Sequence, residues 1–178
     1  SSAGIRSSWA KLTLSGKSSV GGIVGSGSED TSSSAGSSCT VTDCRSLVVV
    51  EDCDQFSGAI SGRDLGVFRG NYFVSDTLRG IDRRSLSGQA EPMDYVAFCA
   101  LGSVPEDFLS FTLRFVCDGR TLKTLRFDYG DSFDFSVFPS LTEQSGSYPV
   151  WDRTDLTDLR FDTVVTVEYT AYRASLQS

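Results

Sequence analysis

The stretch SSVGGIVGSG, residues 18–27, decides how this chain can fold. Its centre is the β-branched pair Ile23-Val24, which is flanked by Gly21, Gly22 and Gly25. β-Branched residues favour strands, whereas glycine favours places where the backbone turns sharply. The stretch therefore predicts a short strand that ends in a tight corner, and it disfavours a helix.

Just before this corner, Gly16-Lys17-Ser18 matches the end of a Walker A phosphate-binding loop. The full motif requires another glycine at position 11, where this chain has Lys11. It also requires a following helix whose N-terminus faces the phosphates, and the glycines of residues 18–25 make such a helix unfavourable. We therefore expect the glycines to form corners between strands, and we expect no nucleotide site.

The composition excludes several classes of function. The 178 residues include 16 Lys+Arg and 23 Asp+Glu, for a net charge of −7, and no histidine. An acidic surface repels phosphate backbones, so we expect no nucleic-acid partner. Without histidine the chain lacks the commonest general base and metal ligand, so we expect no enzymatic activity and no cofactor. The longest apolar run, residues 95–101, is far shorter than the ~20 residues of a membrane helix, so we expect no membrane insertion.

The cysteines are expected to pack in the interior. They are Cys39, Cys44, Cys53, Cys99 and Cys117, and no two of them have the two-residue gap of a zinc ribbon or redox motif. Free cysteine is among the most buried residue types. The spacing leaves a Cys39–Cys44 or a Cys44–Cys53 bridge open as alternatives.

Short β-rich strips recur in the first part of the chain. They are residues 9–14, 20–24, 39–41 and 47–50, each bounded by Gly, Ser or Asp. Because no single strip can bury its own inward face, we expect the strips to stack as turns of a β-solenoid. Residues 94–101 have apolar spacing suited to a short helix, which Pro92 can start, and residues 102–110 read as a linker.

The last third of the chain has the pattern of a small sheet. Apolar and polar residues alternate over 111–116, and Asp118-Gly119 then predicts a type I′ hairpin turn. The return strand is expected over 121–129, with a bulge between Leu122 and Leu125. Val150-Trp151 is a further short strand. Residues 163–172 form the last, with Val165, Val167 and Tyr169 on one face.

Gly21-Gly22-Ile23-Val24-Gly25, followed by residues 39–44 (CTVTDC), resembles the GLUG motif, and residues 56–62 (FSGAISG) look like a degenerate second copy. That family builds right-handed β-helix-like stretches of bacterial surface proteins and of some secreted peptidases. The resemblance implies that the glycines form corners between rungs. It also implies that four side chains stack inward: Val20, Ile23, Val41 and Cys44.

Two further resemblances concern the rest of the chain. Residues 71–82 with 87–92 resemble the segment that closes such β-helices in large surface proteins of gut Firmicutes, which implies a cap over about 64–108. The other resemblance rests on four short segments: residues 116–119 (VCDG), 129–131 (YGD), Trp151-Asp152 and 162–169 (DTVVTVEY). They look like a divergent internalin-type B-repeat, also called the Listeria–Bacteroides repeat. This likeness implies a small β-grasp fold that serves as a spacer or weak adhesion module.

Three groups of residues are candidate sites. Asp152, Asp155 and Asp158, and likewise Asp128, Asp131 and Asp134, recur every third residue and could offer oxygens to calcium, although the full calcium-loop pattern is missing. Glu51, Asp52 and Asp54 could act as paired carboxylates, but a solvated turn is the simpler interpretation. Trp151 and Tyr148, and also Trp9, could stack on a sugar ring or pack in a core.

The sequence thus predicts a mainly β protein of two domains. Residues 1–108 are expected to be the C-terminal rungs of a right-handed β-helix with a short capping helix, and residues 109–178 a small β-grasp-like module. The expected function is that of a structural or adhesive module of a secreted or cell-wall-anchored bacterial protein. Its partners would be a host surface protein or glycan and other domains of the same parent chain. The alternative is a carbohydrate-binding or accessory module of a larger secreted enzyme.

Overall fold

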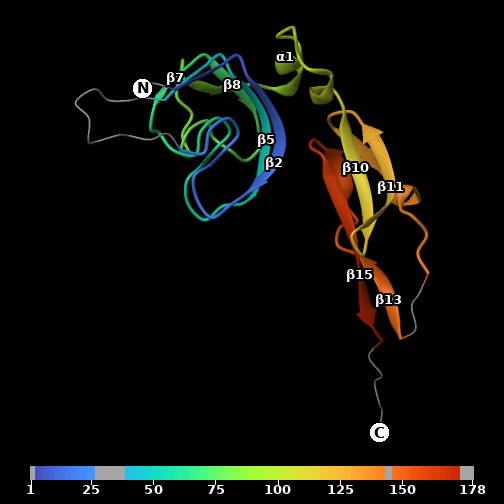
Figure 1. Cartoon of the computed structure of the whole chain (residues 1–178). Coiled ribbons are helices and arrows are strands. Elements are labelled where there is room, and N and C mark those ends of the chain that lie inside the picture. Colours follow the sequence, from blue (N-terminus) through green and yellow to red (C-terminus); the bar gives the residue numbers. More distant parts are fainter. Residues whose placement is uncertain (1–2, 27–38, 143–145, 173–178) are drawn as a thin grey trace. The chain divides into compact units, whose positions relative to one another are not determined.

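The protein is mainly β and forms two compact units, Ser1–Phe108 and Leu109–Ser178 (Figure 1). The computed structural model describes residues 3–26, 39–142 and 146–172. Each unit has its own sheets, and no strand pair joins one unit to the other among the described residues. The two units are therefore described separately.

The first unit is built from three stacked layers of short strands. The first layer (residues 4–26) holds β1 (Gly4–Arg6), β2 (Trp9–Ser15) and β3 (Val20–Gly21). The second layer (39–62) holds β4 (Thr40–Thr42), β5 (Arg45–Asp52) and β6 (Ser57–Gly58). The third layer (67–82) holds β7 (Val67–Arg69) and β8 (Asn71–Val74), and β9 (Ala90–Pro92) follows it.

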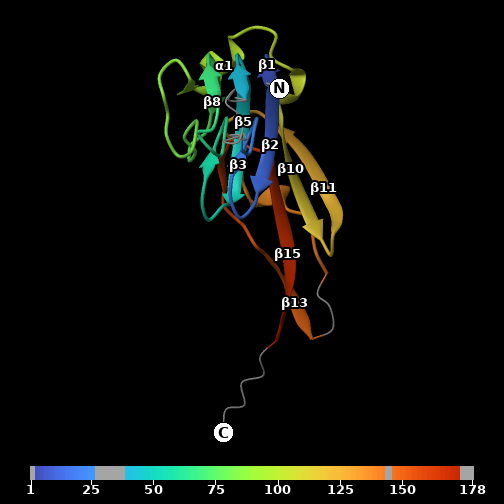
Figure 2. The ribbon, with the colours of Figure 1, turned by 60° about the vertical axis from the view of Figure 1, so that its left-hand side comes forward.

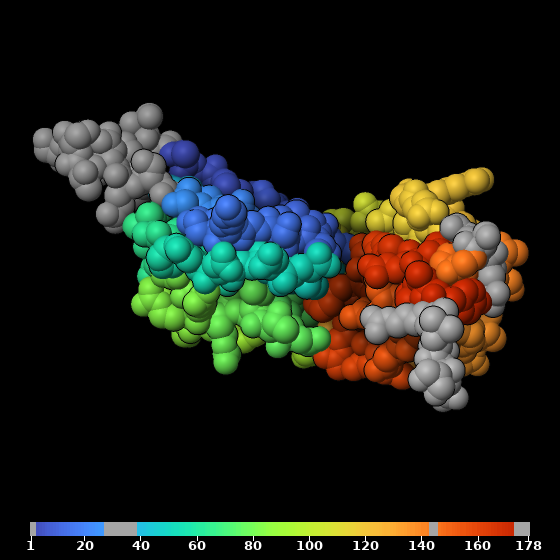
Figure 3. Space-filling model, turned by 90° about the horizontal axis from the view of Figure 1, so that it is seen from below, coloured from blue at the N-terminus to red at the C-terminus, as the bar shows by residue number. Residues whose placement is uncertain are grey.

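The layers pair strand on strand, and every pairing between strands is parallel. The orders are β1-β4-β7, β2-β5-β8-β9 and β3-β6, and parallel bridges continue the third stack from Val24 to Ser61 and on to Ile81. Figure 2 shows β2, β5 and β8 side by side, and in Figure 3 the layers form successive bands from blue through cyan to green. Each layer thus repeats the path of the layer before it.

A left-handed residue turns the chain between the first two strands of every layer. Ser7, Asp43 and Gly70 hold this place, with φ of 47°, 53° and 61°. The amide of Ser7 donates to the carbonyl oxygen of Thr42 at 3.0 Å, and the amide of Asp43 donates to that of Arg69 at 3.0 Å. The same hydrogen bond therefore joins the corner of the first layer to the second layer and the corner of the second layer to the third.

The glycine corner lies after the second strand. A Cβ atom on Gly22 would lie 2.6 Å from Ser46 Oγ and closer still to the carbonyl oxygen of Ala59, and one on Gly58 would lie 2.7 Å from the carbonyl oxygen of Gly80. Neither Gly22 nor Gly58 has a positive φ. Close approach of one layer to the next, and not the left-handed conformation, therefore requires glycine at these two positions.

Hydrogen bonds across this corner repeat from layer to layer. The amides of Ile23 and Val24 both donate to the carbonyl oxygen of Ile60, at 3.0 and 3.1 Å. The amides of Ile60 and Ser61 donate in the same way to the carbonyl oxygen of Gly80, at 2.9 and 3.1 Å. The glycine-rich stretch at 56–62, which the sequence suggests as a second copy, thus stacks on the first copy in register.

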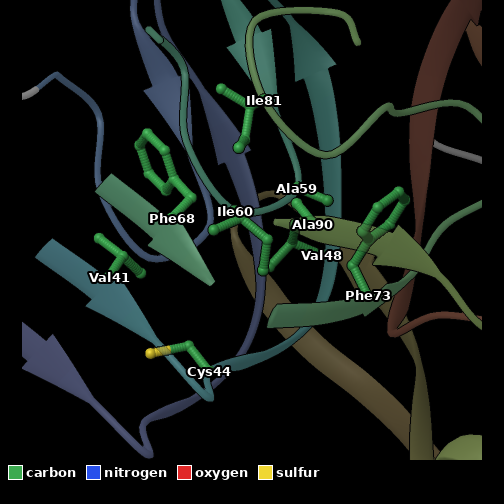
Figure 4. Packing of buried hydrophobic residues seen from close by; sticks show 9 residues of the cluster. All are labelled: Val41, Cys44, Val48, Ala59, Ile60, Phe68, Phe73, Ile81 and Ala90. Carbon is green, nitrogen blue, oxygen red and sulfur yellow. The ribbon is translucent and has the colours of Figure 1, made fainter. Parts of the chain in front are cut away.

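The core of the first unit lies inside these stacks (Figure 4). Its fully buried members include Val41, Val48, Ile60 and Phe73, and Cys44 packs among them. Burial raises the pKa of the Cys44 thiol, whose sulfur lies 3.3 Å from the carbonyl oxygen of Thr42. All five cysteines are free thiols, so neither of the two candidate bridges forms.

Asn71 is a buried polar link between layers. Its Oδ1 accepts the amide of Cys44 at 2.9 Å, and its Nδ2 donates to the carbonyl oxygens of Val41 at 3.0 Å and Gln89 at 2.8 Å. One side chain therefore joins the second layer, the third layer and the segment that leads into β9. All its hydrogen-bonding groups are satisfied, as a buried amide requires.

The closing end of this unit differs from the sequence-based expectation in three places. Strands β7 and β8 pair in register with the second layer, so the closing segment begins after the third layer and not at residue 64. Pro92 ends β9, an edge strand where a missing N–H is tolerated, and Asp94 instead caps α1 (Tyr95–Cys99) by accepting the amide of Ala97. The supposed linker 102–110 contains the 3₁₀ helix η1 (Glu106–Phe108).

An aromatic cluster fixes this closing segment to the first unit. The ring of Trp9 lies 5.5 Å from that of Phe98 of α1 and 5.5 Å from that of Phe108 of η1. Phe98 and Phe108 are both buried. Trp9, a candidate for sugar stacking on the sequence, therefore packs against the cap.

The second unit is a mixed four-stranded sheet with a smaller strand pair. The sheet has the order β11-β10-β15-β13, from β10 (Phe111–Cys117), β11 (Arg120–Phe127), β13 (Ser147–Trp151) and β15 (Thr163–Ala171). The central pair β10–β15 is parallel, and the outer pairs are antiparallel. The other elements are β12 (Asp131–Phe133), the 3₁₀ helix η2 (Phe135–Val137) and β14 (Leu156–Leu159), and β12 pairs with β14.

The β10–β11 hairpin has the turn that its sequence predicts. Asp118 and Gly119 both have positive φ, 50° and 73°, as a type I′ turn requires. The register shifts where Phe115 pairs with Lys123 and the next residue of β10 pairs with Thr121, so Leu122 is the extra residue. The bulge is therefore confirmed, but it lies at Leu122 itself and not between Leu122 and Leu125.

The stacking of layers predicts that Gly22→Ala destabilises the first unit by at least about 2 kcal/mol, because a methyl group there overlaps backbone atoms of the second layer. Gly4→Ala is the matched control, since its Cβ would meet nothing nearer than 3.9 Å, and we expect a change within about 0.5 kcal/mol. Hydrogen exchange of the β5 amides measures both free energies of unfolding. Equal stability of the two variants would contradict the close approach at this corner.

Candidate functional site: the outer face of the second sheet

One face of the second unit's sheet is covered by the rest of that unit. Phe111, Leu113 and Phe115 of β10 and Val165 and Val167 of β15 are buried on this face. The covering elements are β12, β14 and the segment of η2 with its C-cap residue, and their apolar residues are Phe133, Leu156, Leu159 and Phe138. The sequence places Val165, Val167 and Tyr169 on one face of their strand; in the structure Val165 and Val167 are buried and Tyr169 is partly buried.

Trp151 belongs to this covered face. Its ring lies 5.5 Å from that of Phe115 and 5.5 Å from that of Phe138, and the latter two rings are 5.0 Å apart. All three contacts are edge-to-face, the arrangement that aromatic pairs prefer. Of the two roles that the sequence left open for Trp151, the geometry matches packing in the core of the sheet.

The other face of the sheet stays exposed. We call it the outer face and define it by Arg114, Tyr148, Val150, Val164, Glu168, Thr170 and Tyr172. Four of these are large apolar or aromatic residues with 39–54% of their surface exposed: Tyr148, Val150, Val164 and Tyr172. The ladder places Val150 opposite Glu168 and Val164 opposite Arg114, so the two valines are separated along β15 by four positions.

Tyr148 and Tyr172 form an exposed pair at one end of the outer face. Their ring centroids are 5.3 Å apart with an interplanar angle of 43°. The amide of Tyr172 donates to the carbonyl oxygen of Gly146 at 3.0 Å, which holds Tyr172 beside β13. Because side chains alternate across a strand, Tyr148 and Trp151 lie on opposite faces and cannot line one binding surface together.

The outer face carries both signs of charge. Arg114 of β10 and Glu168 of β15 project from it, and each stands opposite an exposed valine on the neighbouring strand. Aromatic rings, aliphatic groups and single charges on an exposed surface suit a weak contact with a polar partner. The alternation of side chains over residues 163–172 places Val164 and Glu168 on the same face of their strand. Only the pairing of β15 with β13 brings Tyr148 and Tyr172 together.

The aspartates proposed as calcium ligands have separate local roles. Asp155 Oδ1 accepts the hydroxyl and the amide of Thr157, and these two hydrogen bonds, the hydroxyl first, lower the pKa of Asp155. Asp158 forms an ion pair with Arg160 at 2.7 Å, and Asp152 accepts an amide of β15 at 2.9 Å. The described residues contain no group of three or more acidic, Cys or His side chains that could hold a metal ion.

The second aspartate series is also used locally. Asp131 accepts the amide of Asp128 at 2.8 Å, and Asp134 caps η2 by accepting the amide of Ser136 at 2.9 Å. The hydroxyl of Ser136, and then its amide, lower the pKa of Asp134. These residues serve as turn and cap residues, the common use of aspartate.

The remaining candidates lie on the first unit. Glu51 and Asp52 end β5, and with Asp54 they are exposed to solvent. Lys17 is exposed in the turn between β2 and β3, and a strand and not a helix follows it. The helix that a phosphate-binding loop needs is therefore missing at this position.

No helix in the described part of the chain is long and apolar enough to cross a membrane. Comparison of the chain with protein-family models, with curated proteins and with solved structures gives no match. The resemblances that the sequence suggests therefore remain predictions, and function is argued from the geometry of the two units.

The opposite placement of the two aromatic residues of β13 predicts opposite effects on stability. Trp151→Ala removes a ring from the core cluster and is expected to cost about 3 kcal/mol, whereas Tyr148→Ala on the outer face should cost less than about 1 kcal/mol. Hydrogen exchange of the β10 and β15 amides reports on this unit in the whole chain. A Tyr148→Ala variant as unstable as Trp151→Ala would show that the outer face is not a free surface.

Proposed function

We propose that this protein is a structural and weakly adhesive module of a secreted or surface-anchored bacterial protein. In this proposal the first unit is the terminal part of a right-handed β-solenoid, and the second unit is a β-grasp-like module. The observation that carries the proposal is the in-register parallel stacking of three layers with equivalent corners in each. A stack of this kind extends by adding layers, each about 4.8 Å thick, and therefore suits a spacer.

The two ends of the stack support an assignment as a solenoid terminus. At one end β9, α1 and η1 follow the third layer and leave Phe73, Ile81 and Phe98 fully buried. Solenoids need such a cap, because an uncovered terminal layer exposes apolar side chains and unpaired strand edges. The parallel central pair of the second unit, flanked by one antiparallel strand on each side, supports a β-grasp-like module.

The outer face is the platform that we assign to adhesion. It presents the exposed Tyr148–Tyr172 pair, and Arg114 and Glu168 add polar contacts. A host surface protein or a glycan is the class of partner that this surface fits. Weak contacts of one face become effective when many copies act together, because each later contact forms at high effective concentration.

The exposed tyrosine pair also favours a second candidate function, a carbohydrate-binding or accessory module of a larger secreted enzyme. Tyrosine rings offer an apolar face for a sugar ring and a hydroxyl for hydrogen bonding. In this alternative, binding would be to one sugar and would not require many copies. The two functions therefore differ in valency and in selectivity.

Binding of the protein to glycan arrays and to host-surface proteins, as single molecules and as beads carrying many copies, tests the proposal. We expect weak binding that needs many copies and falls at least tenfold in Tyr148→Ala/Tyr172→Ala. Phe135→Ala is the control, because Phe135 is also an exposed aromatic residue (66%) but stacks on Phe138 of the covered side.

Two outcomes would count against this proposal. Selective binding of one sugar by single molecules, removed by the double substitution, would favour the carbohydrate-binding alternative. Binding that is unchanged in Tyr148→Ala/Tyr172→Ala, or that Phe135→Ala removes, would exclude the outer face as the platform. Turnover of a hydrolase substrate by the purified chain would overturn the structural role altogether.

A further inference from the structure

The first layer has an open edge. Strands β1, β2 and β3 each pair with one neighbour only, which is β4, β5 or β6, and no described strand lies along their other side. In Figure 2, β5 lies between β8 and β2, and β2 ends that sheet. No described strand pairs with the other edge of the seven-residue strand β2, and an edge of this kind is a template for another strand.

The core is also incomplete at this edge. Leu12 of β2 is 40% exposed, although Val48, its partner in the second layer, is 0% exposed. Other inward residues of the first layer are only partly buried, and each stands in register with a residue that is 0% exposed. The pairs are Ile5 with Val41, Ala10 with Ser46, and Val24 with Ser61.

At the opposite end of the stack, the inward apolar side chains of the third layer are buried. In the third layer Phe68, Phe73 and Ile81 are buried, with at most 4% of their surface exposed. The difference is that β9 pairs with β8 on its far side and that α1 and η1 follow. Both ends have inward apolar residues, but among the described strands only those of the third layer have a further strand, β9, paired on their far side, whereas α1 and η1 also contact Trp9 of the first layer.

We propose that the open edge of the first layer is a docking surface for one further parallel β-layer of the same construction. This inference deepens the proposed function and rests on it. The occupant carries two strands parallel to β1 and β2, with a left-handed residue between them that stacks on Ser7. It also has a glycine at the position that stacks on Gly21 and Gly22 of the first layer.

The pairing already present specifies that occupant. Between the first and second layers, the Ser7 and Gly22 amides donate to Thr42 and Gly58 of the next layer, and the inward side chains are β-branched or small. A layer running in the same direction continues all of these contacts. A second copy of the chain related by a two-fold axis would instead set β2 antiparallel to β2, and the two kinds of corner would not stack on their equivalents.

The register also defines a direct test. Gly4 and Val67 both pair with Thr40, so they occupy equivalent positions at the start of their layers. Residues 39–66 lead into Val67 in the chain, and a copy of them can therefore lead into Gly4 in the same way. The test protein is residues 4–178 with a copy of residues 39–66 joined directly before Gly4, in place of residues 1–3. The added copy should dock on the first layer, slow hydrogen exchange of the β2 amides by at least about tenfold, and raise the melting temperature of the first unit.

Two variants, one of them a double substitution, give the test its controls. The same fusion with Gly58→Val and Val48→Asp in the added copy only cannot form the layer, and its β2 amides should exchange as in the unmodified chain. Leu12→Lys should leave the unmodified chain nearly unchanged, because this side chain is exposed. In the fusion the same substitution should be destabilising, because the added layer would bury it.

Three results would overturn the inference. They are equal exchange in the fusion and its control, β2 amides that are already as protected as the β5 amides in the unmodified chain, and β2 protection that rises with protein concentration. The last would assign the edge to a second copy. Binding through the outer face, measured on the same proteins, tests the proposed function independently, because the fusion leaves the second unit unaltered.

Discussion

The close approach of backbone to backbone at the glycine corner is the constraint on which the first unit depends. Gly22 and Gly58 meet the next layer with no room for a Cβ atom. Only at this separation can the amides of Ile23 and Val24 share one carbonyl oxygen of the second layer. This contact sets the register, and the register in turn places Val41, Val48 and Ile60 in one core and aligns the left-handed corners.

In the second unit, successive side chains along each strand point to opposite faces of the sheet, so one face is packed and the other is exposed. Trp151 and Tyr148 lie three residues apart and therefore belong to opposite faces. The cluster around Trp151 holds the sheet to η2, and this support leaves the outer face accessible. Packing and recognition are thus assigned to different aromatic residues of the same short strand.

Local signals in the sequence predicted local features well. The Asp118-Gly119 turn, the inward Val165 and Val167 and the glycine corners follow from residue type and spacing. The sequence places the third layer in the cap, because this layer lacks the double glycine, and only the pairing of β7 and β8 with the second layer reveals it. Phe108 was assigned to a linker, since nothing local shows that Trp9 will contact it. The Tyr148–Tyr172 pair likewise depends on a register between strands that are distant in the sequence.

The central claim is that the layers of the first unit stack in parallel and in register, and nuclear Overhauser contacts between backbone protons test it most directly. Parallel, in-register stacking predicts amide contacts that place Leu12 beside Val48 and Leu47 beside Val74, with the weak Hα–Hα contacts of parallel strands. Strong Hα–Hα contacts between β2 and β5, which mark antiparallel pairing, or a register shifted by one residue would contradict the account.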